Sequence, residues 1–88
     1  MRALTKTEAV ALIEVIWNLD GTQCRVSKGR YEVYLMGSEV SQVEAEVEGF
    51  CFERGIDLDP DTITITADRI EGSDLDVVRV VIKTEEAA

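Results

Sequence analysis

The chain has 88 residues, with 18 Asp and Glu against nine Lys and Arg and no histidine, so its formal net charge is −9. This length allows one domain and excludes a second. The 45% share of apolar residues is typical of a globular chain and argues against intrinsic disorder. Nucleic acids and anionic membranes carry the wrong sign of charge to bind it directly, so a basic protein surface is the favoured partner.

The acidic residues are concentrated in the C-terminal part of the chain. Residues 1–36 contain five basic and four acidic side chains, whereas residues 37–88 contain four basic and fourteen acidic ones. The net charge is therefore +1 for residues 1–36 and −10 for residues 37–88, and any electrostatic function is expected in the second part.

The two cysteines, Cys24 and Cys51, are too few for a disulfide scaffold, and without histidine they cannot form a Cys/His zinc site. The N-terminus becomes acidic too early for a signal peptide, and no apolar run approaches the ~18 residues of a membrane span. We expect reduced thiols, no cofactor and a cytoplasmic location.

A helix is predicted over residues 6–19. Thr5-Lys-Thr-Glu8 has the form of a capping box, and Asp20-Gly21 ends the apolar run. Apolar side chains cover more than half of this helix, which is more than packing on one sheet requires. A second helix or a second subunit is therefore expected beside it.

Alternating segments at 23–27 and 30–36 flank Lys28-Gly29 and predict a β-hairpin. A second helix is predicted over residues 39–54, with Ser38 or Ser41 as its N-cap and Gly55 closing it. Its spacing places a valine and phenylalanine stripe against the sheet. A groove of small residues, Ser41, Ala45 and Gly49, is expected to face the first helix or a second copy of the chain.

Two further strands are predicted at residues 62–67 and 75–83. Threonine and isoleucine alternate in the first, whereas the second is apolar on both faces and should lie centrally in the sheet or at an interface. The element order α-β-β-α-β-β predicts an α+β fold, a four-stranded antiparallel sheet with two helices on one face. We expect a single acidic domain over residues 1–83 and a disordered acidic tail over 84–88.

Three aspartates, Asp57, Asp59 and Asp61, follow the second helix with the spacing of a calcium loop. Thr62 occupies the position where that loop needs glycine, Pro60 stiffens the turn and a strand follows at once, so no metal site is predicted. Without histidine, neither cysteine nor serine has an imidazole base, and no glycine-rich phosphate loop follows a strand. The sequence therefore predicts a protein that is not an enzyme, with a small carboxylate-based enzyme as a minor alternative.

Two surfaces remain as candidates for function. The first, which we call the acidic set, comprises Glu39, Glu44, Glu46, Glu48, Glu53, Asp57, Asp59 and Asp61. Glu44 and Glu48 are one helical turn, roughly 6 Å, apart, and carboxylates at that spacing approximate the charge density of a nucleic-acid backbone. The second, which we call the open-face set, is a candidate dimer interface on the uncovered face of the sheet: Tyr34, Thr64, Val77, Arg79 and Val81.

In size, acidity and lack of catalytic motifs the chain resembles phage or mobile-element inhibitors of host machinery, such as anti-CRISPR or DNA-mimic proteins. This likeness of profile implies a non-enzymatic protein that docks on a basic, nucleic-acid-binding surface of a larger protein. The alternative is a self-associating assembly module whose carboxylates serve only solubility.

Overall fold

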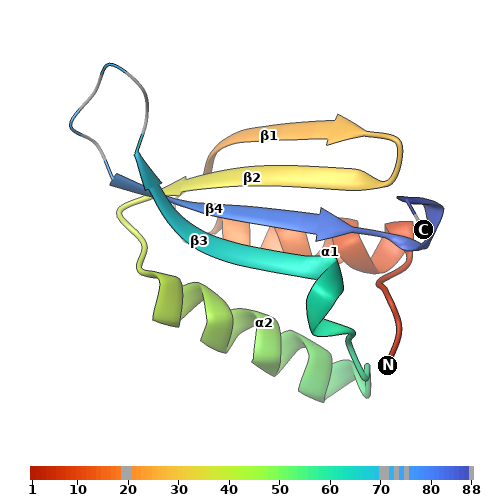
Figure 1. Cartoon of the computed structure of the whole chain (residues 1–88). Coiled ribbons are helices and arrows are strands. Elements are labelled where there is room, and N and C mark those ends of the chain that lie inside the picture. Colours follow the sequence, from red (N-terminus) through yellow and green to blue (C-terminus); the bar gives the residue numbers. More distant parts are fainter. Residues whose placement is uncertain (19–20, 70–71, 73, 75, 88) are drawn as a thin grey trace.

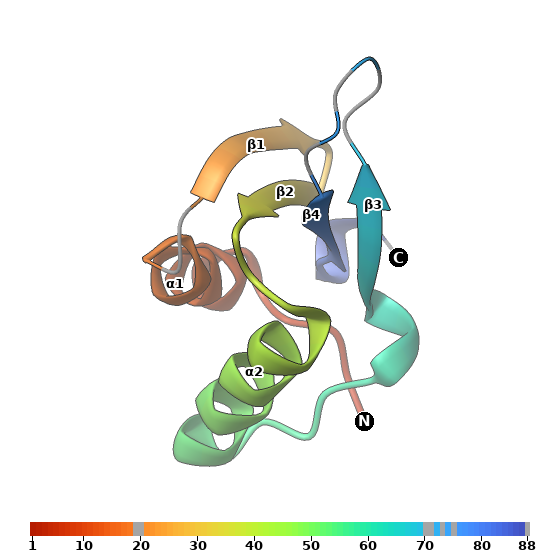
Figure 2. The ribbon, with the colours of Figure 1, turned by 90° about the vertical axis from the view of Figure 1, so that its left-hand side faces the viewer.

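The computed structural model describes residues 1–18, 21–69, 72, 74 and 76–87. Its main elements are α1 (Lys6–Trp17), β1 (Gly21–Ser27), β2 (Arg30–Met36), α2 (Val40–Arg54), β3 (Ile63–Arg69) and β4 (Asp76–Lys83) (Figure 1). The strands form one antiparallel sheet in the order β1-β2-β4-β3. Both helices lie on the same side of this curved sheet (Figure 2), so the predicted α+β architecture is confirmed.

The predicted capping box is present at the start of α1. The Glu8 backbone N–H donates to Thr5 Oγ1 (3.2 Å), and the Thr5 N–H donates to the Glu8 carboxylate (2.9 Å). The helix ends at Trp17 with Asn18 as its C-cap. The expected helix end at residue 19 and the Asp20 turn lie outside the described residues.

Gly55 closes α2 as predicted, in a left-handed conformation with φ 64°. The N-terminus of α2 differs from the prediction, because the N-cap is Glu39 and neither Ser38 nor Ser41. The chain leaves β2 through Gly37 at φ 73°, and on this path Glu39 is the extended residue before the first turn, without a capping side-chain hydrogen bond. Within the described ranges, no helix is both long and apolar enough to cross a membrane.

β4 is a central strand, paired with β2 on one side and β3 on the other. Val78, Val80 and Ile82 face the helices, Val77 and Val81 face away, and all five are buried. The sequence prediction of a central strand is therefore confirmed. Its expected first residue, Leu75, and part of the preceding turn lie outside the described residues.

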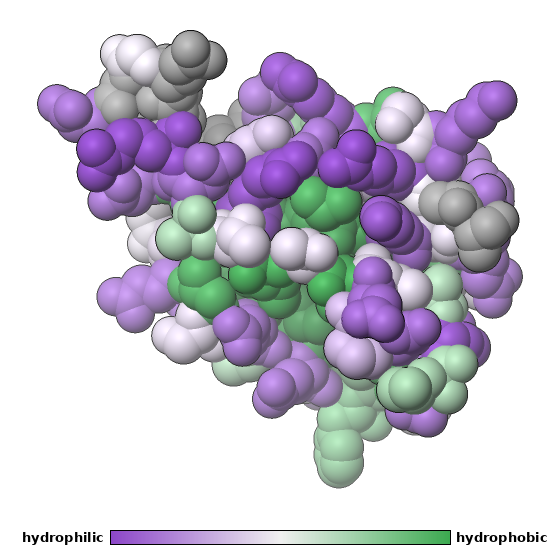
Figure 3. Space-filling model, viewed as in Figure 1, coloured by the Kyte–Doolittle hydropathy of each residue, from purple (hydrophilic) through white to green (hydrophobic). Residues whose placement is uncertain are grey.

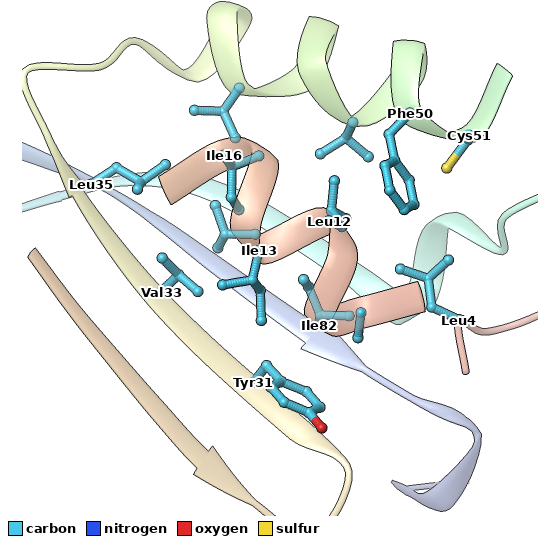
Figure 4. Packing of buried hydrophobic residues seen from close by; sticks show 14 of the residues in the cluster. Leu4, Leu12, Ile13, Ile16, Tyr31, Val33, Leu35, Phe50, Cys51 and Ile82 are labelled. Atoms are coloured by element: carbon cyan, nitrogen blue, oxygen red, sulfur yellow. The ribbon is translucent and has the colours of Figure 1, made fainter. Parts of the chain in front are cut away.

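The core lies between the two helices and the sheet (Figure 4). Leu12 and Ile16 of α1 belong to one buried cluster with Phe50 of α2 and with Val33 and Leu35 of β2. Burial of such side chains contributes about 1.5–3 kcal/mol each. The wide apolar arc of α1 is only partly covered, since three of its side chains stay exposed: Val10, Val15 and Trp17.

The small-residue groove of α2 does not receive α1. Ser41, Ala45 and Gly49 are all exposed, and a Cβ added at Gly49 would meet nothing within 4 Å. Val43, Val47 and Phe50 of the valine and phenylalanine stripe instead share one buried cluster with α1 and the sheet.

The C-terminal segment differs from the predicted disordered tail. Thr84 is 1% exposed, and both its backbone N–H (2.7 Å) and its hydroxyl (2.9 Å) donate to the carbonyl oxygen of Gly29. The Glu85 N–H donates to the Leu4 carbonyl at 3.1 Å, and a 3₁₀ turn follows over Glu85–Ala87. These hydrogen bonds fix the segment between the β1–β2 turn and the N-terminal segment; Ala88 lies outside the described residues.

Candidate functional site

The carboxylates of α2 lie in two rows on either side of its buried stripe. Glu44 and Glu48 line a cleft on the side of α2 that faces β3. Glu46 and Glu53 border a shallow hollow on the side that faces α1, together with Val15. The structure therefore divides the helical members of the acidic set between two sides of one helix, with Glu39 exposed at its N-terminus.

The aspartates that follow α2 differ in their surroundings. Asp57 Oδ2 lies 3.1 Å from the amino group of Met1. The Asp59 carboxylate accepts the Asp61 N–H at 3.0 Å and so caps a 3₁₀ turn over Pro60–Thr62. Pro60 lines the same cleft as Glu44 and Glu48, which places this turn beside the first carboxylate row.

In the part of the chain that the structure describes, Asp57 alone of the acidic set has a cationic ion-pair partner. Arginines that could neutralise the others are engaged elsewhere: Arg2 with Glu8, Arg30 and Arg79 with Glu32, and Arg69 with Asp76. Arg54, in the last turn of α2, lies over the Phe50 ring, with its guanidinium carbon 4.5 Å from the ring centroid. The negative charge along α2 is therefore largely uncompensated.

An uncharged ridge separates the two carboxylate rows on the outer side of α2. Ser41 and Ala45 are exposed there, Gly49 lies at its border with the hollow that faces α1, and Phe52 has 88% of its surface exposed. Phe52 was not among the site residues predicted from the sequence. A fully exposed phenylalanine flanked by carboxylates has the composition of an interface anchor with a polar rim.

The cleft beside Glu44 and Glu48 is open and mostly apolar, with a volume of about 520 Å³. Figure 3 shows apolar side chains gathered between β3 and α2 and bordered by hydrophilic ones. Its lining residues come from α2, the segment after it and β3: Glu44, Val47, Glu48, Cys51, Ile56, Leu58, Pro60, Ile63 and Ile65.

Sequence reasoning missed this cleft. Ile63 and Ile65 belong to the predicted alternating strand but were not predicted to be only half-buried, and Ile56 and Leu58 were given no role. The alternation of Ile56 and Leu58 with aspartates was the available signal, because it marks an extended segment with one apolar side.

The surroundings of the two thiols favour their protonated form. Burial raises the pKa of both Cys24 and Cys51, so each stays protonated, and nucleophilic chemistry needs the thiolate. Over the described residues, no cluster of three or more carboxylates or thiols is arranged to hold a metal ion.

The open-face set lies together on the side of the sheet away from the helices, with Tyr34 paired with Arg79 and Thr64 with Val81. Arg79 forms an ion pair with Glu32, and this hydrogen-bonded pair lowers the pKa of Glu32 and raises that of Arg79. Val77 and Val81 are only 3% and 6% exposed within the monomer. Dimerisation through this face stays a prediction, and it would have to rely mainly on polar contacts.

Comparison with protein-family models, with curated proteins and with solved structures finds no match for this chain.

Proposed function

We propose that this protein is a non-enzymatic binding protein that docks on a basic, nucleic-acid-binding surface of a larger protein. The observation that carries the proposal is the uncompensated charge of α2, where Glu39, Glu44, Glu46, Glu48 and Glu53 lack ion-pair partners within the described chain. Such a field attracts a positively charged surface and accelerates its association.

Apart from Glu39, these carboxylates are not placed where they would stabilise the helix. Negative charge stabilises the N-terminal end of a helix and destabilises its C-terminal end, and only Glu39, the N-cap, lies at the favourable end, whereas Glu53 lies near the C-terminal end of α2. Glu44 and Glu48 also form a like-charge i,i+4 pair, which costs about 0.2–0.5 kcal/mol. A role in binding accounts for a placement that helix stability opposes.

The partner class that fits best is a protein with a Lys/Arg channel for DNA or RNA. Carboxylates one turn apart along α2 substitute for phosphates, and the exposed Phe52 supplies an apolar anchor between the two rows. By occupying that channel the protein acts as a cytoplasmic inhibitor. The profile is that of phage or mobile-element inhibitors such as anti-CRISPR or DNA-mimic proteins.

The test uses affinity capture from a bacterial lysate on the immobilised full chain, with the variant Glu44→Gln/Glu48→Gln/Glu53→Gln as matched control. We expect the wild type to retain a nucleic-acid-binding protein that is released by duplex DNA or by added salt, and the variant to lose it. Capture of the same proteins by both chains, or retention that neither duplex DNA nor RNA displaces, would contradict the proposal.

A further inference from the structure

The cleft between α2 and β3 has the shape of a groove with two different walls. Ile63 and Ile65 of β3 form one wall, and Val47 and Cys51 of α2 form the other. Ile56, Leu58 and Pro60 close one end, while Glu44 and Glu48 stand on the α2 side. Its volume of about 520 Å³ lies within the range of protein pockets that bind drug-sized ligands. A site of this size can hold a few side chains of a peptide.

The β3 wall is also a free sheet edge. β3 pairs with β4, and within the described residues no strand pairs with its other side. Every second residue of an edge strand directs its backbone N–H and C=O away from the sheet, ready to pair with another chain.

The two edges of the sheet differ in how they are protected. β1 carries a register shift between Gly21 and Gln23 and contains the charged residue Arg25. β3 pairs with β4 in continuous register, and its charged residues, Asp68 and Arg69, lie only at its end. Bulges and charges are the usual devices that prevent strand addition, so β3 is the edge that remains open to it.

A strand added to β3 would present its side chains alternately to the two faces of the sheet. Those on the helix side would enter the cleft, next to Ile63 and Ile65, and the others would lie beside Thr64 and Thr66. Glu44 and Glu48 lack cationic partners in the described chain and would favour a cation among the side chains in the cleft.

We propose that this cleft binds an extended segment of a partner polypeptide, which adds to β3 as a fifth strand. Every second side chain of that segment faces the cleft, and these side chains are apolar residues together with an Arg or Lys. Main-chain pairing supplies affinity and the cleft supplies specificity, as in other strand-addition complexes. The inference rests on the proposed function, because Glu44 and Glu48 belong to both surfaces.

The test titrates the ¹⁵N-labelled full chain with the capped peptide Thr-Leu-Thr-Arg-Thr-Leu-Thr, followed by NMR. We expect shift changes confined to β3, α2 and the Ile56–Pro60 segment, with slower amide exchange along β3. The isomer Thr-Thr-Leu-Leu-Arg-Thr-Thr places its leucines on opposite faces and should bind at least about tenfold more weakly.

A matched pair of variants separates the two edges of the sheet. Ile65→Arg introduces a charge into the cleft and should weaken binding of the alternating peptide by about tenfold or more. Val26→Arg makes a similar change at an exposed apolar residue of β1, the other edge strand, and should alter binding by less than about twofold. If Ile65→Arg does not fold, exchange of the peptide Arg for Gln provides the second measurement. That exchange should weaken binding to the wild type but not to Glu44→Gln/Glu48→Gln.

Equal affinity for the alternating and isomeric peptides, or shift changes outside this cleft, would overturn the inference. If both peptides bind equally and salt releases both, the cleft proposal fails while docking through the carboxylates stands. If the alternating peptide binds as expected but the triple Gln variant captures the same lysate proteins as the wild type, the proposed function fails and the cleft remains a peptide site. Dimers that occupy the cleft with a second copy would also overturn the inference.

Discussion

Glu8 connects the N-terminal segment to α1 through one carboxylate. The Arg2 guanidinium donates two hydrogen bonds to it, at 2.6 and 2.8 Å, and the Thr5 N–H donates a third. These donors favour the charged form, so the pKa of Glu8 falls from its ordinary value of 4.5 to about 2, with the Arg2 hydrogen bonds as the largest cause.

The change Glu8→Gln should lower the free energy of unfolding by about 1–2 kcal/mol at neutral pH, because it removes the ion pair and weakens the capping box. The pKa of Glu8 is lower in the folded chain, so its contribution is present above about pH 4.5 and is lost as the pH falls toward 2. In urea unfolding followed by circular dichroism, the free energies of unfolding of the wild type and of Glu8→Gln should converge over that pH interval. Glu14→Gln, an exposed change on the same helix, should have little effect at any pH; a wild-type advantage that persists near pH 2 would contradict the assignment.

Phe52 supplies a second test at this scale. Because it is 88% exposed, Phe52→Ser should change stability by less than about 0.5 kcal/mol, yet weaken partner binding by about tenfold or more if Phe52 anchors the interface. Val26→Ser, at another exposed apolar residue that lies on β1, is the control and should leave binding unchanged. Calorimetric titration with the captured partner measures the affinity of both variants. Unaltered affinity of the Phe52 variant would show that Phe52 is not part of the interface.

At the scale of the element, alanine substitution of Gly49 in α2 and of Gly55, its C-cap, should change stability in opposite directions. Gly55→Ala forces a side chain into a left-handed conformation at φ 64° and should lower stability by about 1 kcal/mol. Gly49→Ala occurs in the exposed helix interior, where the added Cβ meets nothing within 4 Å, and should raise stability by about 0.5–1 kcal/mol. Thermal unfolding of the two variants checks both signs, and a destabilising Gly49→Ala would show that this face is already packed against something.

The elements that sequence reasoning predicted correctly are those whose signals are local. The capping residues Thr5 and Glu8 are three positions apart, Gly55 directly follows its helix, and the two apolar faces of β4 are visible in eight consecutive residues. The N-cap of α2 was wrong because Ser38, Glu39 and Ser41 all lie near the helix start, and the choice depends on how the chain leaves β2 at Gly37. The cleft was missed because the half-burial of Ile63 and Ile65 depends on how much of β3 the helices cover, which is a tertiary property.

At the scale of the whole molecule, the net charge of −9 is held within a small volume. The chain has a radius of gyration of 12.4 Å and extends 37 Å along its longest axis. The Debye length is about 30 Å at 0.01 M salt and about 8 Å at 0.15 M. Carboxylates therefore repel one another across the molecule in dilute buffer, but only sense close neighbours at physiological salt.

The stability of the free protein should therefore rise with added NaCl between about 0.01 and 0.15 M. A few like-charge pairs at about 0.2–0.5 kcal/mol each amount to about 1 kcal/mol, which corresponds to about 4–8 °C in Tm for a domain of this size. Differential scanning calorimetry across this series measures the change. The Glu44→Gln/Glu48→Gln/Glu53→Gln variant should start from a higher Tm and gain less, and a Tm that falls with salt would show that ion pairs such as Arg2–Glu8 outweigh the repulsion.

The same carboxylates should give the opposite dependence on salt once a basic partner is bound. Screening relieves repulsion in the free chain but weakens attraction across the interface, so Tm of the free protein and affinity for the partner should change in opposite directions over one NaCl series. A protein whose carboxylates serve only solubility would show the first trend without the second. Calorimetric titrations at the two ends of that series distinguish the cases, and the triple Gln variant should reduce both slopes together.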